Sequence, residues 1–268
     1  MPKKKEPKKQ KKKKKRKFRK LFVSTAAFIT AAVIIIFCLY HVYFKTDYFN
    51  LAEIQITGNS TYNKDYILGK SQIETGNKIF SIDRDEVKSI LEDEVYIEKA
   101  RVIYELPNII LIELTERMEK YQILYNQEYI VIDSDGIVLR TGKEKNELLT
   151  IESFTDVLYN VGDNIQFAGI DDIHYVFNTI DYINSEFGSD AVKSQYISAN
   201  NSFLLETEYG TFIKIKLDED IKYQIVFAMK ILNQRMNNNL AVTNGLIDFT
   251  KGDSPVYTED FKMEELNE

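Results

Sequence analysis

The hydrophobic positions of the chain include one unbroken run of 24 apolar or small residues, Leu21–Phe44, without Pro or Gly. A helix needs roughly 20 apolar residues to cross a bilayer. Tyr40 and Tyr43 stand at the far end of the run, where aromatic rings favour the membrane interface. A cleaved signal peptide would have a shorter apolar region and a small-x-small site after it, and neither is present. The run therefore predicts one transmembrane helix at residues 21–44.

Beyond the run, residues 49–117 alternate between strand and helix patterns. Asp83, followed three residues later by Glu86, is a capping box that starts a helix. Leu106-Pro107-Asn108 is typical of a turn between strands. The pattern predicts a strand at Phe49–Thr57, a helix at Thr61–Gln72 with Tyr66 and Ile67 facing inward, a helix from Asp83 to about Val95, and strands at Ala100–Tyr104 and Ile109–Thr115.

Residues 118–258 are richer in short strands, separated by Gly, Asn and Asp turns. Two amphipathic helices interrupt them, one around Ile173–Ile183 and one around Ile221–Leu232. The predicted strands are Tyr121–Tyr125, Tyr129–Asp133, Ile137–Leu139, Leu149–Ile151, Tyr196–Ala199, Phe203–Thr207, Thr211–Leu217 and Leu246–Phe249, with Pro255–Tyr257 as a candidate extension of the last. The acidic segment 259–268 is expected to be disordered. Together these patterns predict an α+β fold with a small first domain and a second, mixed α/β domain whose sheet is largely antiparallel.

Charge separates the two ends of the chain. Residues 1–20 hold 14 Lys or Arg, although the whole chain carries a net charge of −6. Basic residues beside a membrane helix hold that end in the cytoplasm and attract anionic lipids, which is the favoured interpretation. Nucleic-acid binding by the Lys-rich arm is the alternative. The tail is too charged to fold on its own.

Candidate chemistry is sparse. The only cysteine, Cys38, and one of the two histidines, His41, lie in the apolar run, and His174 is expected at least half-exposed on a helix. Asp133-Ser134-Asp135-Gly136 resembles the start of a calcium loop, but a hairpin turn explains it better. No phosphate-binding glycine loop or nucleophile elbow is present. We therefore expect no cofactor, no metal and no catalytic residue, while paired carboxylates of a glycosidase type remain an open alternative.

The order of these parts resembles the FtsQ/DivIB family of bacterial cell-division proteins over residues 20–258. The residues that carry the resemblance are Gly58-Asn59, Gly76–Asp83, Ile97–Arg117, Ile132–Leu139 and Leu246–Phe249. Where that family usually has a proline after Glu-Arg, this chain has Met118-Glu119-Lys120, so the link between the two domains departs from the family's pattern. The resemblance implies a POTRA-like domain at residues 49–117, with the order β-α-α-β-β, followed by a β-rich domain at 118–258.

The resemblance further implies a scaffold rather than an enzyme. Family members join FtsL-like and FtsB/DivIC-like single-pass coiled-coil proteins and help regulate septal peptidoglycan synthesis. The expected location is the cell membrane at the division septum, with the amino terminus in the cytoplasm and the carboxy terminus outside. A membrane-anchored cell-wall enzyme, a nucleic-acid binder and a transport-associated POTRA protein are the competing hypotheses.

An exposed last strand would bind a partner strand through its free backbone groups. The positions similar to the family's partner-binding edge are Leu246, Ile247, Asp248, Phe249, Thr250 and Tyr257. Of these, Phe249 and Tyr257 are the expected anchors for the partner. The alternative is that both side chains simply pack into the carboxy-terminal core. The POTRA-like domain is a second candidate contact surface.

Overall fold

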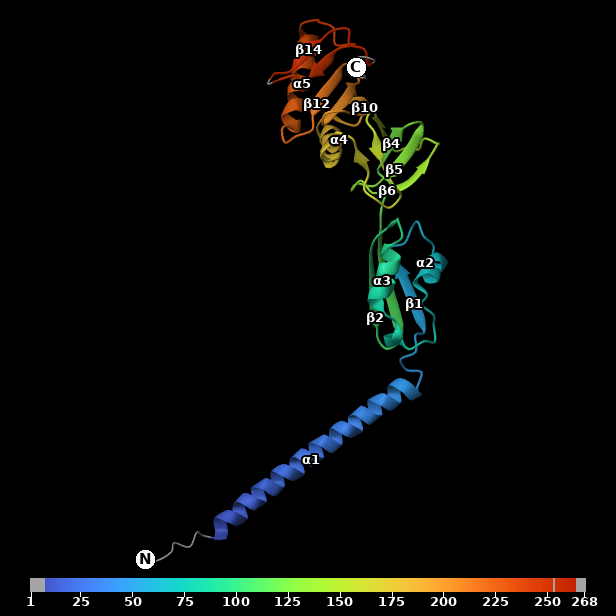
Figure 1. Cartoon of the computed structure of the whole chain (residues 1–268), viewed down its shortest axis with the longest axis vertical. Coiled ribbons are helices and arrows are strands. Elements are labelled where there is room, and N and C mark those ends of the chain that lie inside the picture. Colours follow the sequence, from blue (N-terminus) through green and yellow to red (C-terminus); the bar gives the residue numbers. More distant parts are fainter. Residues whose placement is uncertain (1–7, 253, 264–268) are drawn as a thin grey trace, which may run out of the picture. The chain divides into compact units, whose positions relative to one another are not determined.

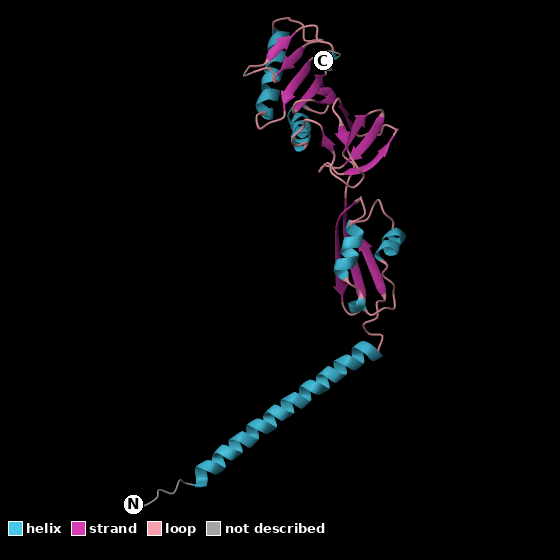
Figure 2. Cartoon of the chain, in the orientation of Figure 1, coloured by secondary structure: helices cyan, strands magenta, loops and turns pink. Residues whose placement is uncertain are grey.

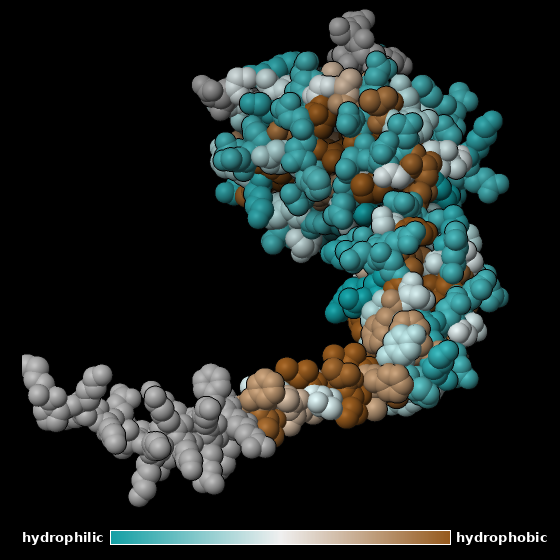
Figure 3. Space-filling model, turned by 60° about the horizontal axis from the view of Figure 1, so that its bottom comes forward, coloured by the Kyte–Doolittle hydropathy of each residue, from teal (hydrophilic) through white to brown (hydrophobic). Residues whose placement is uncertain are grey.

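The computed structural model describes residues 8–252 and 254–263. Its first element is α1 (Lys8–Lys45), whose span Phe22–Lys45 contains an 18-residue stretch with a mean hydropathy of 2.6 and no buried residue (Figure 3). This confirms one apolar helix long enough to span a membrane. The expectation that the basic tail does not fold is wrong for residues 8–20, since Lys and Arg favour helix and extending an existing helix needs no nucleation. Residues 1–7 lie outside the described residues.

The chain divides into two compact units, of which the first includes α1: residues 1–91 with 99–114, and residues 92–98 with 115–268. Residues 49–117 have the predicted order β-α-α-β-β (Figures 1 and 2). The strands form a sheet in the order β1-β3-β2, and β1 runs parallel to β3 with Glu53 opposite Ile109. The elements are β1 (Glu53–Thr57), α2 (Lys64–Ser71), a 3-10 turn η1 (Ile79–Ser81), α3 (Arg84–Glu92), β2 (Ile97–Glu105) and β3 (Ile109–Glu116).

Local chemistry explains where the helices of this domain begin and what they bury. The Asp83 carboxylate accepts the backbone N–H groups of Asp85 (3.0 Å) and Glu86 (3.3 Å), so the predicted cap of α3 is confirmed. Ile67 of α2 is fully buried as expected. Its neighbour Tyr66 is 38% exposed and stacks on Tyr62, 4.6 Å between ring centroids. The inward prediction for Tyr66 is wrong because adjacent residues of a short helix point about 100° apart.

The second unit is built on a sheet of nine described strands in the order β14-β13-β12-β11-β10-β7-β4-β5-β6. Three of its eight pairings are parallel, and the others are antiparallel. The mixed, largely antiparallel sheet was predicted. The strands are β4 (Tyr121–Tyr125), β5 (Glu128–Ile132), β6 (Val138–Gly142), β7 (Leu149–Ser153), β10 (Val192–Ser198), β11 (Ser202–Thr207), β12 (Phe212–Lys216), β13 (Leu246–Asp248) and β14 (Val256–Thr258).

Two helices, α4 (His174–Phe187) and α5 (Ile221–Asn237), pack their apolar side chains on one face of this sheet. Phe177 of α4 stacks on Tyr121 of β4 with 4.6 Å between ring centroids. The amphipathic pattern of both helices predicted this burial. A separate two-stranded ribbon, β8 (Val157–Leu158) and β9 (Gln166–Phe167), was not predicted, because two-residue strands leave no periodic signal.

The opposite face of the sheet carries a smaller apolar cluster near the carboxy terminus. Phe261 is buried there with Leu204 and Leu246, and its ring lies 5.4 Å from that of Phe212. Disorder was expected for residues 259–268, and the burial of Phe261 shows that this is wrong for the described residues 259–263. Residues 264–268 lie outside the described residues. The acidic composition of this segment gave no indication that Phe261 would be buried.

Candidate partner-binding edge

The predicted binding segment divides between an inner strand and a turn. β13 pairs on one side with β12, with Phe212 opposite Leu246, and on the other with β14, with Ile247 opposite Tyr257. The final strand predicted at Leu246–Phe249 therefore lies inside the sheet, and β14, which contains Tyr257 of the candidate extension, is the edge of the described sheet (Figure 1). Sequence patterns give strand positions but not the order of strands, so a three-residue strand beyond β13 changes which backbone is free.

Three of the six predicted residues are buried in β13. Leu246 faces the small cluster with Phe261, and Ile247 faces the helix-side core. The Asp248 carboxylate is buried and accepts both the backbone N–H of Thr250 (2.8 Å) and its hydroxyl (2.6 Å). These bonds form a turn that ends the strand. The three residues therefore support the edge strand β14 from inside the sheet. Thr250 is exposed just after β13.

Phe249 packs into the core, which is one of the two roles that the sequence left open. Its backbone N–H donates to Lys214 O (2.9 Å), and its half-buried ring packs against the helix-side core. The ring lies 6.4 Å from that of Phe227 on α5, which in turn lies 5.5 Å from that of Tyr223. Phe249 therefore belongs to the core and also ends an aromatic row whose far member, Tyr223, is exposed.

Tyr257 lies on the edge strand itself and is clamped by α5. The guanidinium carbon of Arg235 stands 3.6 Å from the centre of the Tyr257 ring, close enough for a cation–π contact. The Tyr257 hydroxyl donates to Ala241 O (3.2 Å), and Arg235 donates to the same carbonyl (2.9 Å) and to Glu259 (2.7 Å). Together these contacts fix β14 to the helix beside it.

Gly245 makes room for this clamp. A Cβ atom built at residue 245 would lie 2.2 Å from the Tyr257 hydroxyl oxygen. The dipeptide Asn244-Gly245 is a turn signal in sequence and gives no sign of this close approach, and the sequence analysis named neither Arg235 nor Glu259. No local pattern joins these residues, because each comes from a different element.

The backbone of β14 leaves one residue facing outward. Gly245 O and the Phe249 N–H bond to β12, so by the alternation of a strand Leu246 and Asp248 turn their backbone groups toward β14. Their partners, Thr258 and Val256, therefore face β13. The N–H and C=O of Tyr257 point the other way, to the open side of the sheet. This is the geometry that an added strand needs.

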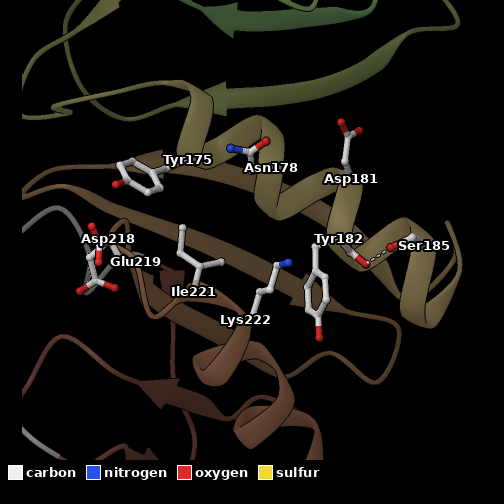
Figure 4. Close-up of a pocket in the computed structure, with 9 residues that line it drawn as sticks. All are labelled: Tyr175, Asn178, Asp181, Tyr182, Ser185, Asp218, Glu219, Ile221 and Lys222. Carbon is white, nitrogen blue, oxygen red and sulfur yellow. Dashed lines mark hydrogen bonds between the residues drawn. The ribbon is translucent and has the colours of Figure 1, made fainter.

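A second feature of this unit is a hollow of about 490 Å³ between α4 and the start of α5, which Figure 4 shows. Its walls carry Asp181, Asp218 and Glu219, and Lys222 lies beside the ring of Tyr182, 5.4 Å from its centre. Asp181 is paired with Lys120 (3.1 Å), and Asp218 with Lys216 (3.6 Å). Lys120 directly precedes β4 and Lys216 ends β12, so both ion pairs join the walls of the hollow to the sheet.

The Asp-Gly segment after β5 is a turn, as the sequence analysis preferred. The Asp133 carboxylate accepts the N–H groups of Asp135 and Ile137, both at 2.9 Å, and Gly136 has a φ of 82°. The other carboxylate oxygen of Asp133 lies 2.7 Å from the Arg117 guanidinium. Both carboxylate oxygens of Asp133 are thus engaged by donors. Among the described residues, no group of three or more His, Cys, Asp or Glu is placed to hold a metal.

Another charged cluster in the second unit joins Tyr96, Glu119 and Arg140. Arg140 donates to both carboxylate oxygens of Glu119, at 2.6 and 2.9 Å, and the Tyr96 hydroxyl donates to one of them at 2.8 Å. Burial and the bond to Glu119 raise the pKa of Tyr96 to about 12. The hydrogen bond from Arg140 lowers the pKa of Glu119. These bonds join the residue before β2 and strand β6 through Glu119, which also lines a hollow of about 380 Å³.

Comparison with known proteins agrees with this architecture. A family model described as POTRA domain, FtsQ-type, matches residues 49–117. The cell division protein DivIB of Clostridium tetani is 28% identical over 206 residues, which cover 76% of this chain and 77% of that protein. DivIB of Clostridium botulinum (strain Hall) is 26% identical over 80% of this chain and 83% of its own length.

A third DivIB, from Clostridium acetobutylicum, is 31% identical over 99 residues, 37% of this chain and 40% of that protein. The matches thus extend from a POTRA model over residues 49–117 to likeness over 76% and 80% of the chain with two relatives. The apolar helix, the β-α-α-β-β unit and the mixed sheet that follows stand in the order that the resemblance implied. The chain carries an FtsQ-type POTRA domain and is similar, over about three quarters of its length, to DivIB cell-division proteins.

Proposed function

We propose that the chain is a non-catalytic scaffold of the division machinery. It binds the outer segments of FtsL-like and FtsB/DivIC-like single-pass coiled-coil proteins, and through them it helps regulate septal peptidoglycan synthesis. The amino terminus is cytoplasmic, the parts of both units after α1 lie outside, and the protein concentrates at the septum. The dense Lys and Arg content of residues 1–20 supports this orientation, because positive flanks stay on the cytoplasmic side.

The observation that carries the proposal is the free edge of β14. Tyr257 presents its N–H and C=O outward, and Arg235 and Ala241 hold its side chain against α5. A rigid edge loses little conformational entropy when a partner strand pairs with it. An extended segment of a partner could add there, with its side chains meeting the row formed by Phe249, Phe227 and Tyr223.

The edge strand β14 also has features that disfavour pairing with non-specific strands. β14 has only three residues, and Pro255 just before it lacks a backbone N–H. A generic strand therefore gains few hydrogen bonds, and affinity must come from side chains that fit the surrounding surface. This is the behaviour expected of a scaffold that selects particular partners.

The test separates the backbone of Tyr257 from its ring. Tyr257→Pro removes the outward N–H, whereas Tyr257→Ala removes the same ring and keeps that N–H. Proline is tolerated on an edge strand where its nitrogen faces away from the ladder, so both variants should fold. Full chains in detergent would be used to capture the outer segments of the coiled-coil division proteins, with folding checked by circular dichroism.

We expect Tyr257→Ala to weaken capture and Tyr257→Pro to abolish it. Equal capture by the two variants would show that the outward N–H of Tyr257 plays no part. Undiminished capture by both would remove β14 from the account and leave the POTRA domain as the candidate contact surface.

A further inference from the structure

Aromatic rings form a continuous chain from the end of α1 into the POTRA domain. Tyr43 of α1 lies 6.0 Å from both Phe49 and Phe80, measured between ring centroids. Phe49 and Phe80 are 5.6 Å apart, and Phe80 meets the edge of Tyr104 at 5.6 Å. These rings join the apolar helix to η1 and to the end of β2 within one compact unit.

Three large apolar side chains at the same end of this domain are exposed to solvent. Tyr48 is 59% exposed, Phe80 47% and Leu106 59%. The turn that carries Leu106 adjoins the start of β1, because Ala52 N–H donates to Asn108 O at 2.8 Å. Ile79, next to Phe80, is fully buried. Burial of Ile79 therefore anchors the η1 turn, and the backbone of the turn directs the neighbouring Phe80 ring outward.

Cationic side chains accompany the rings. The Lys78 ammonium donates to Thr46 O (2.7 Å), one residue past the end of α1, and lies 5.7 Å from the centre of the Tyr43 ring. The Arg84 guanidinium stands 4.5 Å over the Tyr104 ring. Lys45 ends the helix. Aromatic rings combined with long cationic side chains are the residues that prefer the headgroup layer of a bilayer.

We propose that an apolar belt places the POTRA domain in the headgroup layer of the bilayer that α1 crosses. The belt consists of five aromatic residues, Tyr43, Tyr48, Phe49, Phe80 and Tyr104, together with Leu106. The occupant is a phospholipid surface, because the belt is continuous with the membrane-spanning helix. Tyr48 follows Lys45 by three residues, which reach about 10 Å at most. The bilayer interface is therefore within reach of the belt without any partner protein.

This placement would restrict how the POTRA domain tilts on its anchor and so how it presents its surface to partners. Lys78 supports this by bonding a carbonyl just beyond the helix, where the backbone has no helical partner of its own. The inference needs α1 to span a membrane, but it does not need the orientation or the partners proposed above. A failure of this inference and a failure of the scaffold proposal are therefore distinguishable.

The test uses the absence of tryptophan from the chain. Phe80→Trp and Leu106→Trp each place a single fluorophore in the belt, and Thr57→Trp places one at the opposite, exposed end of β1. Full chains would be reconstituted in phosphatidylcholine–phosphatidylglycerol vesicles, with and without lipids brominated near the headgroup end of their acyl chains. Brominated lipids quench only fluorophores that touch the bilayer.

We expect brominated lipids to reduce the emission of Phe80→Trp and Leu106→Trp by at least half, and to leave that of Thr57→Trp unchanged. In the same vesicles, a water-soluble quencher should reduce the emission of Thr57→Trp more than that of the other two variants. Emission that is unquenched by lipid in both belt variants would overturn the proposal. Equal quenching of all three would also overturn it, because the domain would then lie on the membrane without a defined placement.

Discussion

At the scale of single residues, the ion pair between Arg117 and Asp133 explains why charged side chains stand beside a β-turn. Both side chains are largely buried, and their atoms lie 2.7 Å apart. The same Asp133 carboxylate also holds two turn N–H groups. Removing one partner of a buried pair leaves an uncompensated charge, which is costly.

Asp133→Ala should therefore lower the free energy of unfolding of the second unit by about 3 kcal/mol. Asp135→Ala is the matched control, since Asp135 is exposed and 3.9 Å from Arg117, and a change of about 0.5 kcal/mol or less is expected. Urea unfolding followed by near-ultraviolet circular dichroism measures both. Equal midpoints for the two variants would contradict the role given to Asp133.

Tyr96 and Glu119 make stability depend on pH at opposite ends of the scale. Burial, and then the bond to Glu119, raise the pKa of Tyr96 from 10.0 to about 12, so the fold favours the protonated phenol. Its contribution is complete below pH 10 and is lost as the pH rises through about 12. The hydrogen bond from Arg140 lowers the pKa of Glu119, whose contribution is present above 4.5 and is lost as the pH falls.

Tyr96→Phe should flatten the alkaline loss of stability relative to the unmodified chain between pH 10 and 12. Tyr223→Phe, at an exposed tyrosine, should keep the full loss. Thermal unfolding at a series of pH values gives both curves. If Tyr96→Phe and the unmodified chain lose stability in parallel, the Tyr96–Glu119 bond does not carry the effect.

At the scale of elements, sequence patterns predicted the positions of most strands and helices along the chain, but not which strands lie next to one another in the sheet. β4 was predicted to the residue because Asn126 and Gln127, both at positive φ, end it sharply. α4 and α5 followed from their apolar periodicity. β8, β9 and the position of β14 at the edge were missed, since pairing across the sheet depends on contacts between distant residues. The clamp of Arg235, Gly245 and Tyr257 was missed for the same reason.

Two glycines give opposite predictions for one substitution. Gly245→Ala would bring a Cβ within 2.2 Å of the Tyr257 hydroxyl and should push β14 off α5, at a cost of about 2 kcal/mol. Gly69→Ala meets no atom within 4 Å in helix α2 and should stabilise the first unit by about 0.5–1 kcal/mol. Urea unfolding measures each change. Destabilisation by Gly69→Ala, or tolerance of Gly245→Ala, would count against the packing described.

At the scale of the whole molecule, charge and hydropathy sort the chain into a basic start, an apolar helix and two folded units. This organisation was readable from the sequence because the bilayer imposes a length and a charge rule on any spanning helix. The helical state of residues 8–20 was not predicted from the sequence, because their like charges disfavour folding. The adjoining apolar helix supplies the nucleus from which these residues extend the helix.

The basic start should orient the chain. Replacing the Lys and Arg residues of positions 1–20 with Gln should give a mixture of two membrane orientations instead of one. Protease digestion of intact cells, followed by detection of the carboxy-terminal unit, distinguishes the two. Full retention of a single orientation would show that other features set the topology.

The central claim is that a partner strand pairs with β14, and hydrogen exchange at a single backbone amide tests it most directly. In the free chain the Tyr257 N–H faces solvent and should exchange quickly, while the Phe249 N–H, bonded to Lys214 O, should be protected. On binding the coiled-coil division proteins, we predict that Tyr257 becomes protected by at least tenfold and that Phe249 changes little. A Tyr257 amide that exchanges equally fast in the bound complex would contradict strand addition at this edge.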